Sequence, residues 1–405
     1  MIKEFSKYFI CSLGFYAGIL VLLLMTFSLR GEWATIVNFD FLTWDAKHLK
    51  FLAFEGYDFP RSAFYPLFPF FWKLTSFSPL GVSIFNGVLF TISFSLMAAE
   101  WKIELRRFII YLATPSLLFM FLPYSEAFLF FFSVLFLIAI KRDSTWLLIV
   151  SVFLMSLTKP TASILLPTIV LAEYLSNLKN HFPWKRMFLA GSVIICANFL
   201  VYFVQFLATN EWFTFFQAQA EWGNRLSIPS FPLGTWNQPH IIWIDAAALW
   251  FCSLAIVIGV AAGYQKFFQQ KTSDRVVAYT VLYLAGTGLF VLLFRSGSLF
   301  SLNRFVFAVP FFFVGLEELR KVGVNNSTKL FFSLVAGFLL YSLLFGSYQH
   351  IQQVLLYALF GIFLSLWTCC VFMDRSKIFS GILLVLLIIC QIFYFTLAIR
   401  GEWVG

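Results

Sequence analysis

The residues best suited to chemistry lie in one stretch, 43–73, directly after the first apolar segment. Asp45 and His48 are three residues apart, a spacing that puts two side chains on one face of a helix. A carboxylate in such a position can accept or orient a proton, and His48 can bind a phosphate or hydrogen-bond within the loop. Leu49 and Leu52 continue an apolar side, which predicts a short amphipathic helix lying in the membrane interface. The alternative is a solvated loop in which Trp44 only anchors the chain at the headgroups.

Two more charged residues stand at breaks between apolar runs. Glu126 follows Tyr124 and Ser125, and a carboxylate at membrane depth usually faces a cavity. It also suits the first turn of a helix that Ser125 caps. Lys159 precedes Pro160, which breaks the helix, so this cation either finds an anionic partner such as a phosphate or Glu126, or extends to the interface.

Two arginines enclose a later polar segment. Arg295 and Arg304 flank three serines and an asparagine, and two guanidiniums with hydroxyls nearby suit a lipid-linked phosphate or pyrophosphate. Headgroup anchoring explains them equally well. Loop 209–243 has the aromatic and amide content of a sugar pocket, but tryptophan is also the standard interfacial residue. Its candidates are Trp212, Gln217, Gln219, Glu221, Trp222, Asn224, Arg225, Trp236, Asn237 and Trp243.

The composition identifies the class of protein. Of 405 residues, 61% are hydrophobic and 12% are charged, about half the charged share of a soluble domain. We therefore expect a single all-α domain, 1–405, that crosses the membrane many times. The net charge of +9 is spread over short loops, which argues against nucleic-acid binding. The six cysteines lie inside apolar runs and the four histidines are scattered, so neither a disulfide framework nor a zinc site is expected.

About 11–13 transmembrane helices are predicted, because a span needs roughly 20 apolar residues. The first carries Lys3 and Lys7 before it and no small-residue cleavage site, which indicates a retained helix. The runs around 107–176 are short and suit paired or re-entrant helices. The predicted spans are 9–29, 80–99, 107–123, 125–140, 145–159, 160–176, 188–208, 244–263, 275–294, 304–317, 329–347, 352–372 and 378–398.

Charge predicts the orientation. Alternate loops are rich in lysine and arginine, which puts them and the N-terminus in the cytoplasm. The extracytoplasmic face then receives loop 30–79, the turn at Glu126, the break at Lys159, loop 209–243 and the segment 295–304. The basic residues assigned to the cytoplasm are Lys3, Lys7, Lys102, Arg106, Arg107, Lys141, Arg142, Lys179, Lys185, Arg186, Lys266, Lys271, Arg275, Arg320, Lys321, Lys329, Arg375 and Lys377.

The first outer loop resembles the PIG-V family of mannosyltransferases. The resemblance rests on Trp44-Asp45-Ala-Lys-His48, then Gly56-Tyr57, then Ala63-Phe-Tyr-Pro66-Leu-Phe-Pro69. It continues at Tyr124-Ser125-Glu126-Ala127 and at Asn303-Arg304-Phe305, while Lys159 stands where the family usually has arginine. Elsewhere the likeness is one of hydrophobicity only.

The resemblance implies a glycosyltransferase of the GT-C type, with amphipathic helices in the first extracytoplasmic loop. Such an enzyme moves a hexose, here first of all mannose, from a polyprenyl-phosphate donor to a lipid or glycan acceptor, with inversion. Asp45 matches the family's essential acid. Arg304, Lys159 and Arg295 would hold the donor phosphate, and His48, Glu126, Trp44 and Tyr57 would contact substrate. No cofactor is required, although Asp45, His48 and Glu126 would hold a divalent metal ion if they converged.

Two rival functions remain. A flippase or transporter of lipid-linked sugar would share the outer cavity without bond chemistry, and a membrane scaffold would need no acidic loop. No nucleotide-binding loop, Rossmann glycine pattern, nucleophile elbow or zincin motif occurs. Nothing in the sequence identifies a partner subunit. The shorter chain favours a bacterial-type relative in the plasma membrane, and a eukaryotic one would lie in the membrane of the endoplasmic reticulum.

Overall fold

The fold is built of helices throughout the part of the chain that the structure describes, which confirms the predicted all-α class. The computed structural model describes residues 2–160, 164–177, 184–235, 240–321, 360–361, 364–365 and 377–405. Within these ranges the one β-type pairing is an isolated bridge between Gly234 and Ser298. The helices are α1 (Ile2–Leu29), α2 (Trp33–Val37), α3 (Asp45–Phe54), η1 (Pro60–Ala63), α4 (Leu67–Thr75), α5 (Pro79–Trp101), α6 (Leu105–Leu112), η2 (Pro115–Phe121), α7 (Glu126–Lys141), α8 (Thr145–Thr158), α9 (Leu165–Ser176), α10 (Trp184–Thr209), α11 (Thr214–Glu221), α12 (Ile242–Gln269), α13 (Arg275–Phe294), α14 (Leu302–Phe307), α15 (Pro310–Lys321) and α18 (Lys377–Ile399).

The chain is a multi-pass membrane protein. Among the described residues, six helices are long and apolar enough to cross a bilayer, and a bent pair formed by η2 and α7 raises the number to seven. The six are α1, α5, α10, α12, α13 and α18, and each coincides with a predicted span. The predicted spans 125–140, 145–159 and 160–176 appear as the shorter helices α7, α8 and α9. The predicted spans 329–347 and 352–372 lie outside the described residues, apart from four residues of the second.

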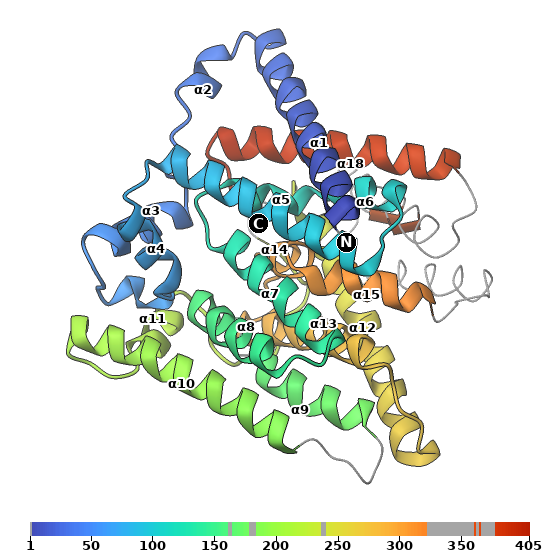
Figure 1. Ribbon diagram of the computed structural model, residues 1–405. Coiled ribbons are helices and arrows are strands. Elements are labelled where there is room, and N and C mark those ends of the chain that lie inside the picture. The colour runs from blue at the N-terminus through green and yellow to red at the C-terminus, as the bar shows by residue number, and fades with distance from the viewer. Residues whose placement is uncertain are drawn as a thin grey trace.

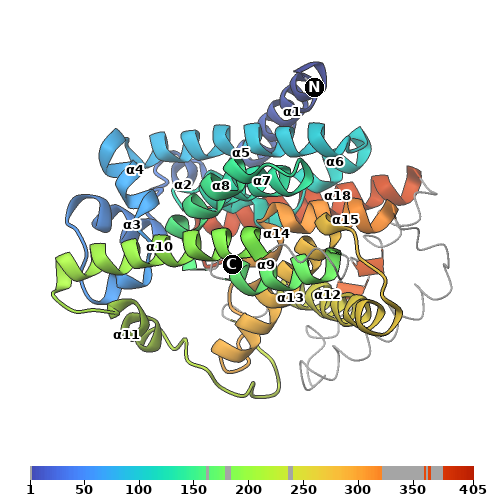
Figure 2. The same ribbon diagram turned by 60° about the horizontal axis from the view of Figure 1, so that its bottom comes forward.

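The amphipathic elements gather at one end of the long helices. In both views α3, α4 and α11 lie together beside one end of α5 and α10, whereas α6 lies at the opposite end of α5 (Figures 1 and 2). The pattern of α3 explains its position, because Ala46, Leu49, Leu52 and Ala53 are its buried residues and follow helical spacing. The short amphipathic helix predicted after Trp44 is thus present.

The prediction of one span over 107–123 is wrong, because the chain there is broken into α6 and η2, and η2 and α7 meet at a bend of 105°. Such backbone survives within a membrane only where protein covers it and supplies hydrogen bonds. Asn86 of α5 donates to the carbonyls of Leu122 (2.7 Å) and Tyr124 (2.9 Å). From α18, Gln391 donates to the carbonyl of Leu112 (3.1 Å). Side chains of neighbouring helices therefore satisfy the irregular segment.

The predicted span 304–317 is also divided, into α14 and α15. The division has a consequence for function, because α14 is a short buried helix that carries Arg304 into the interior. The core beside it is largely aromatic. Phe311 at the start of α15 stacks on Tyr283 of α13, with ring centroids 3.8 Å apart, and such stacks bury large apolar area at fixed geometry.

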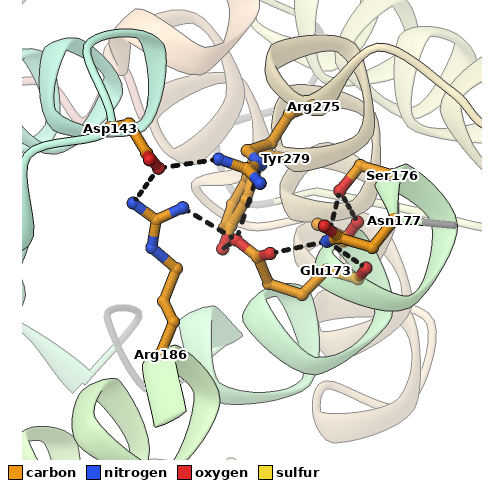
Figure 3. Close-up of polar contacts among 8 residues, drawn as sticks. Asp143, Glu173, Ser176, Asn177, Arg186, Arg275 and Tyr279 are labelled. Atoms are coloured by element: carbon orange, nitrogen blue, oxygen red, sulfur yellow. Dashed lines mark hydrogen bonds and ion pairs between the residues drawn. The ribbon is translucent and has the colours of Figure 1, made fainter. Parts of the chain in front are cut away.

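Residues predicted to face the cytoplasm make a second polar cluster, shown in Figure 3. Asp143 lies between α7 and α8 and receives ion pairs from Arg186 (2.6 Å) and Arg275 (2.9 Å). Glu173 of α9 is buried, and Tyr279 donates a hydrogen bond of 2.8 Å to it. The cluster ties α9, α10 and α13 to the α7–α8 turn. Arg186 and Arg275, both assigned to the cytoplasmic face, thus share Asp143 as their partner. Lys179, Lys329 and Arg375, assigned to the same face, lie outside the described residues.

Candidate functional site

Asp45 is the first residue of α3, where its carboxylate is partly buried with 20% of the side chain exposed. The helix presents it toward α14, and the Arg304 guanidinium lies 2.8 Å from its Oδ2 atom. Trp44, directly before it, has φ of +46° and ψ of −118°, a conformation that a residue with a side chain rarely adopts. The acid that sequence motifs single out is therefore held by an arginine from a distant segment.

Arg304 joins Asp45 to a second carboxylate. Its Nε atom hydrogen-bonds to Oε1 of Glu126 at the start of α7, and the same oxygen contacts Nζ of Lys159. Arg304 and Glu126 are almost fully buried, and 13% of the Lys159 side chain is exposed. Two acids thus balance two cations, as burial of ionised groups requires.

This pairing resolves two alternatives. The anionic partner of Lys159 is Glu126, and Ser125 makes no side-chain cap at the start of α7. Arg304, Lys159 and Glu126 line a small cavity of about 10 Å³, roughly the volume that one water centre occupies. They do not line the larger cavity described next. Arg304 and Lys159 are therefore committed to carboxylates and are poorly placed to hold a phosphate.

A cavity of about 880 Å³ opens beside Asp45. Apart from Trp403, which follows α18, three segments that are remote in sequence form it: the start of α3 with Trp44, Asp45 and His48; the loop after α11 with Trp222; and the turn that begins at Arg295. Its volume falls in the range of sites that bind small molecules or cofactors. All three segments belong to the loops predicted for the outer face.

Arg295 is the cation that this cavity offers. It donates a hydrogen bond to the carbonyl of Phe300 and lies over the Phe300 ring, 5.1 Å from the centroid. Among the described residues it makes no ion pair with a carboxylate, in contrast to Arg304. Burial lowers the pKa of Arg295 to about 10, and the charge of Arg304 acts in the same direction. Arg295 therefore stays protonated at neutral pH and can bind an anion.

The turn that carries Arg295 depends on a glycine. Gly297 has φ of +89°, and a Cβ atom there would lie 2.4 Å from the carbonyl oxygen of Ser230. Any other residue would force this turn and the loop before α12 apart. Ser230 in turn donates to the carbonyl of Ser296 through its backbone N–H (3.2 Å) and its hydroxyl (2.6 Å). The two segments thus form one wall of the cavity.

Asp245 is an important residue that the sequence reasoning did not single out. It is fully buried in the first turn of α12, where its Oδ1 atom accepts hydrogen bonds from the backbone N–H (2.9 Å) and the amide (2.7 Å) of Asn303. Thr235 donates to its Oδ2 atom (2.7 Å). Asp245 thereby fixes the first turn of α14 and the direction of Arg304. The sequence offered one signal for it: an acidic residue near the start of a predicted membrane span is costly and needs a reason.

His48 and Tyr57 occupy the aromatic side of the loop. The His48 ring stacks on Phe64 at 5.5 Å and meets the edge of Trp222 at 5.4 Å. Burial lowers the pKa of His48, with Asp45 opposing the shift, so the imidazole is neutral at pH 7. Tyr57 donates to the carbonyl of Phe64 (3.0 Å) and does not line the cavity, so its visible role is to hold the loop.

The convergence of Asp45, His48 and Glu126 that would allow them to hold a metal ion does not occur among the described residues. Among the described residues, no three histidine, cysteine, aspartate or glutamate side chains are grouped closely enough to hold one. The carboxylates of Asp45 and Glu126 both face Arg304, whereas His48 packs between aromatic rings. A positive guanidinium between the two acids is unsuited to a cation site.

Comparison with known proteins adds no assignment. The chain matches no family model, no curated protein and no solved structure.

Proposed function

We propose that the chain is a glycosyltransferase that moves a hexose from a polyprenyl-phosphate donor to a hydroxyl of a lipid or glycan acceptor. One observation carries the proposal: Asp45, a carboxylate, and Arg295, a cation without a carboxylate partner among the described residues, line the same cavity. Transfer of a sugar from a phosphate needs a group that takes a proton and a group that stabilises the departing phosphate.

The proposed reaction is an in-line displacement. The acceptor hydroxyl attacks C1 of the donor sugar, and the bond from C1 to the phosphate oxygen breaks as the new glycosidic bond forms. Asp45 takes the hydroxyl proton, and the phosphate leaves with the bonding electrons toward Arg295. A cavity that holds both substrates makes the step effectively unimolecular. Attack opposite to the leaving group inverts the anomeric configuration.

In this proposal Arg304 is a positioning residue. Its guanidinium lies 2.8 Å from the Asp45 carboxylate and fixes it from one side. Glu126 holds Arg304 in turn, and Lys159 neutralises Glu126. Of the three residues expected to bind the donor phosphate, Arg304, Lys159 and Arg295, this proposal keeps Arg295 in that role. His48 and Trp222 offer an aromatic wall for a sugar ring.

The choice of sugar, and the face of the membrane to which the cavity is assigned, both rest on the sequence. The motif around Trp44-Asp45 and His48 resembles PIG-V mannosyltransferases, so mannose is the first sugar to test. Charge bias puts the cavity on the extracytoplasmic face and the N-terminus in the cytoplasm. The meeting of three of the predicted outer segments, 30–79, 209–243 and 295–304, at one cavity supports this orientation. The membrane would be the plasma membrane of a bacterium, or that of the endoplasmic reticulum in a eukaryote.

The test uses purified protein in liposomes with polyprenyl-phosphate [³H]mannose and pools of lipid and glycan acceptors. The wild type is compared with Asp45→Asn and with Asp40→Asn, the same change at an exposed position of the same loop. Loss of a proton-accepting group should reduce transfer by about 10²–10⁴-fold in Asp45→Asn only.

Wild-type turnover by Asp45→Asn would exclude Asp45 from the chemistry. Intact donor that crosses the bilayer, without any labelled product, would instead establish a flippase.

A further inference from the structure

The segment that follows α18 returns to the candidate site. Gly401, with φ of +80°, ends the helix in the left-handed conformation that glycine adopts without strain. Its N–H donates to the carbonyl of Ala398 (3.0 Å), and the N–H of Glu402 donates to that of Leu397 (3.0 Å). This pair of bonds reverses the chain sharply, so that Trp403 points back toward the cavity instead of continuing along the axis of α18.

Trp403 is 5% exposed and lines the cavity. Its ring stacks on Phe300, with centroids 4.9 Å apart and planes 16° apart, and it meets the Trp44 ring nearly edge-on at 5.1 Å. The Arg304 guanidinium lies 5.9 Å from the same ring. Trp403 therefore contacts the residue before Asp45, the segment after Arg295 and the arginine that holds Asp45.

Two polar tethers fix this segment to the first loop. Arg400 makes hydrogen bonds of 2.7 and 2.6 Å to both carboxylate oxygens of Glu32. The indole N–H of Trp44 donates to the carbonyl of Gly401 at 3.1 Å. The segment is thus attached on both sides of the turn, and Trp403 lies just beyond it.

Trp44 needs such support. Its φ of +46° and ψ of −118° fall in a sparsely populated region, which persists where surrounding contacts impose it. It precedes α3 without a side-chain capping bond. The first turn of α3 instead rests on the backbone bonds from Ala46 to Thr43 (3.0 Å) and from Lys47 to Trp44 (3.1 Å). Release of Trp44 would let this turn, and Asp45 with it, relax.

We propose that Trp403 is a positioning residue that holds Trp44 in its positive-φ conformation and so directs the Asp45 carboxylate into the cavity. The kinetic consequence of this inference rests on the proposed transferase function. Its structural consequence, the ordering of Trp44 and the first turn of α3, rests on the contacts alone. It assigns a role in the site to residues 400–405, which carry none of the motif.

The structural test is hydrogen–deuterium exchange of peptides that cover 43–54. Trp403→Ala should speed exchange there at least tenfold, whereas peptides from α5 and α7 keep wild-type rates. Trp403→Phe retains a ring against Phe300 and Trp44 and should remain within threefold of wild type. Trp33→Ala, which removes a half-exposed tryptophan of the same loop, is the matched control and should change nothing.

The kinetic test measures mannosyl transfer from polyprenyl-phosphate mannose. Trp403→Ala should lower kcat at least tenfold with the donor KM within threefold, and Trp403→Phe should restore most of kcat. Unchanged exchange in 43–54, or faster exchange with an unchanged kcat, would overturn the proposal. If the wild type transfers no mannose, the transferase function fails and exchange alone decides the role of Trp403.

If Trp403→Ala loosens the whole fold, hydrogen–deuterium exchange will also be faster in α5 and α7. In that case Glu32→Gln is the variant that tests the proposal. It weakens the exposed tether to Arg400, and Glu32 does not line the cavity. Faster exchange confined to 43–54 supports the proposal, and wild-type exchange in that variant contradicts it.

Discussion

The Arg304 guanidinium lies 2.8 Å from the Asp45 carboxylate and hydrogen-bonds to Glu126 through its Nε atom. One buried arginine thereby links the first predicted outer loop, the start of α7 and the short helix α14. Arg304 contacts Asp45 from the buried interior of the protein, and Asp45 still lines the cavity. This geometry suits a group that accepts a proton from a bound hydroxyl.

Removal of the Arg304 charge should be severe. Arg304→Met leaves the Asp45 and Glu126 carboxylates without their shared partner, and loss of one member of a buried pair costs about 3–5 kcal/mol. We expect a large fall in the thermal unfolding midpoint in detergent. Arg304→Lys keeps the charge, but a lysine contacts one carboxylate at a time. The unfolding midpoint of Arg304→Lys should therefore lie between those of Arg304→Met and wild type. A midpoint for Arg304→Met equal to wild type would show that the pairing adds no stability.

Arg295 should act on the donor rather than on the fold. Arg295→Gln removes the cavity cation, so the donor KM should rise at least tenfold, and inhibition by polyprenyl phosphate without sugar should weaken in proportion. Arg295→Lys keeps the charge and should recover part of the loss. Arg225→Gln, at an exposed position outside the cavity lining, is the matched control. Unaltered inhibition by polyprenyl phosphate in Arg295→Gln would contradict the assignment.

Asn86 should be required for the irregular segment before α7. Asn86→Leu removes the hydrogen bonds to two buried carbonyls, at a cost of roughly 2–6 kcal/mol for two unsatisfied groups. Thr91→Val on the same helix is the control, because the Thr91 hydroxyl, among the described residues, bonds only to the Gly87 carbonyl one turn back. Thermal unfolding of both variants measures the difference. Equal midpoints would mean that the broken span does not depend on Asn86.

His48 should make stability depend on pH. Burial, the largest cause, lowers the pKa of His48 in the folded state below the usual 6.5 of the unfolded chain. The unfolded state therefore binds the proton more readily, and stability falls as pH decreases from 6.5 toward the lowered pKa. Above pH 6.5 this contribution is constant. His48→Phe keeps the ring contacts but does not titrate. Its unfolding midpoint should rise relative to that of wild type between pH 7 and pH 5, and a constant difference would contradict the shift.

The sequence alone predicted the membrane class and much of the helical framework. Runs such as 9–29, 188–208 and 378–398 are apolar over the length of a bilayer, and α1, α10 and α18 coincide with them. The amphipathic pattern after Trp44 likewise predicted α3. Hydropathy could not reveal the breaks within 107–123 and 304–317. Side chains from other helices satisfy the polar groups of these irregular segments: Gln391 of α18 donates to the carbonyls of Leu112 and Thr114 at the first break. Asp245 of α12 accepts from the backbone N–H of Asn303 in the first turn of α14.

For the candidate site, the sequence determined which residue types were available, and the tertiary structure decided their partners. Asp45, Glu126, Lys159 and Arg304 could all be singled out, because ionised groups beside apolar runs are costly and need a reason. Only the fold decided that Arg304 and Lys159 pair with acids, that Arg295 faces the cavity and that Trp403 packs against Trp44. The reason is physical: helix formation and membrane insertion follow local composition, whereas ion pairs and ring contacts depend on distances between segments that meet only when the helices pack.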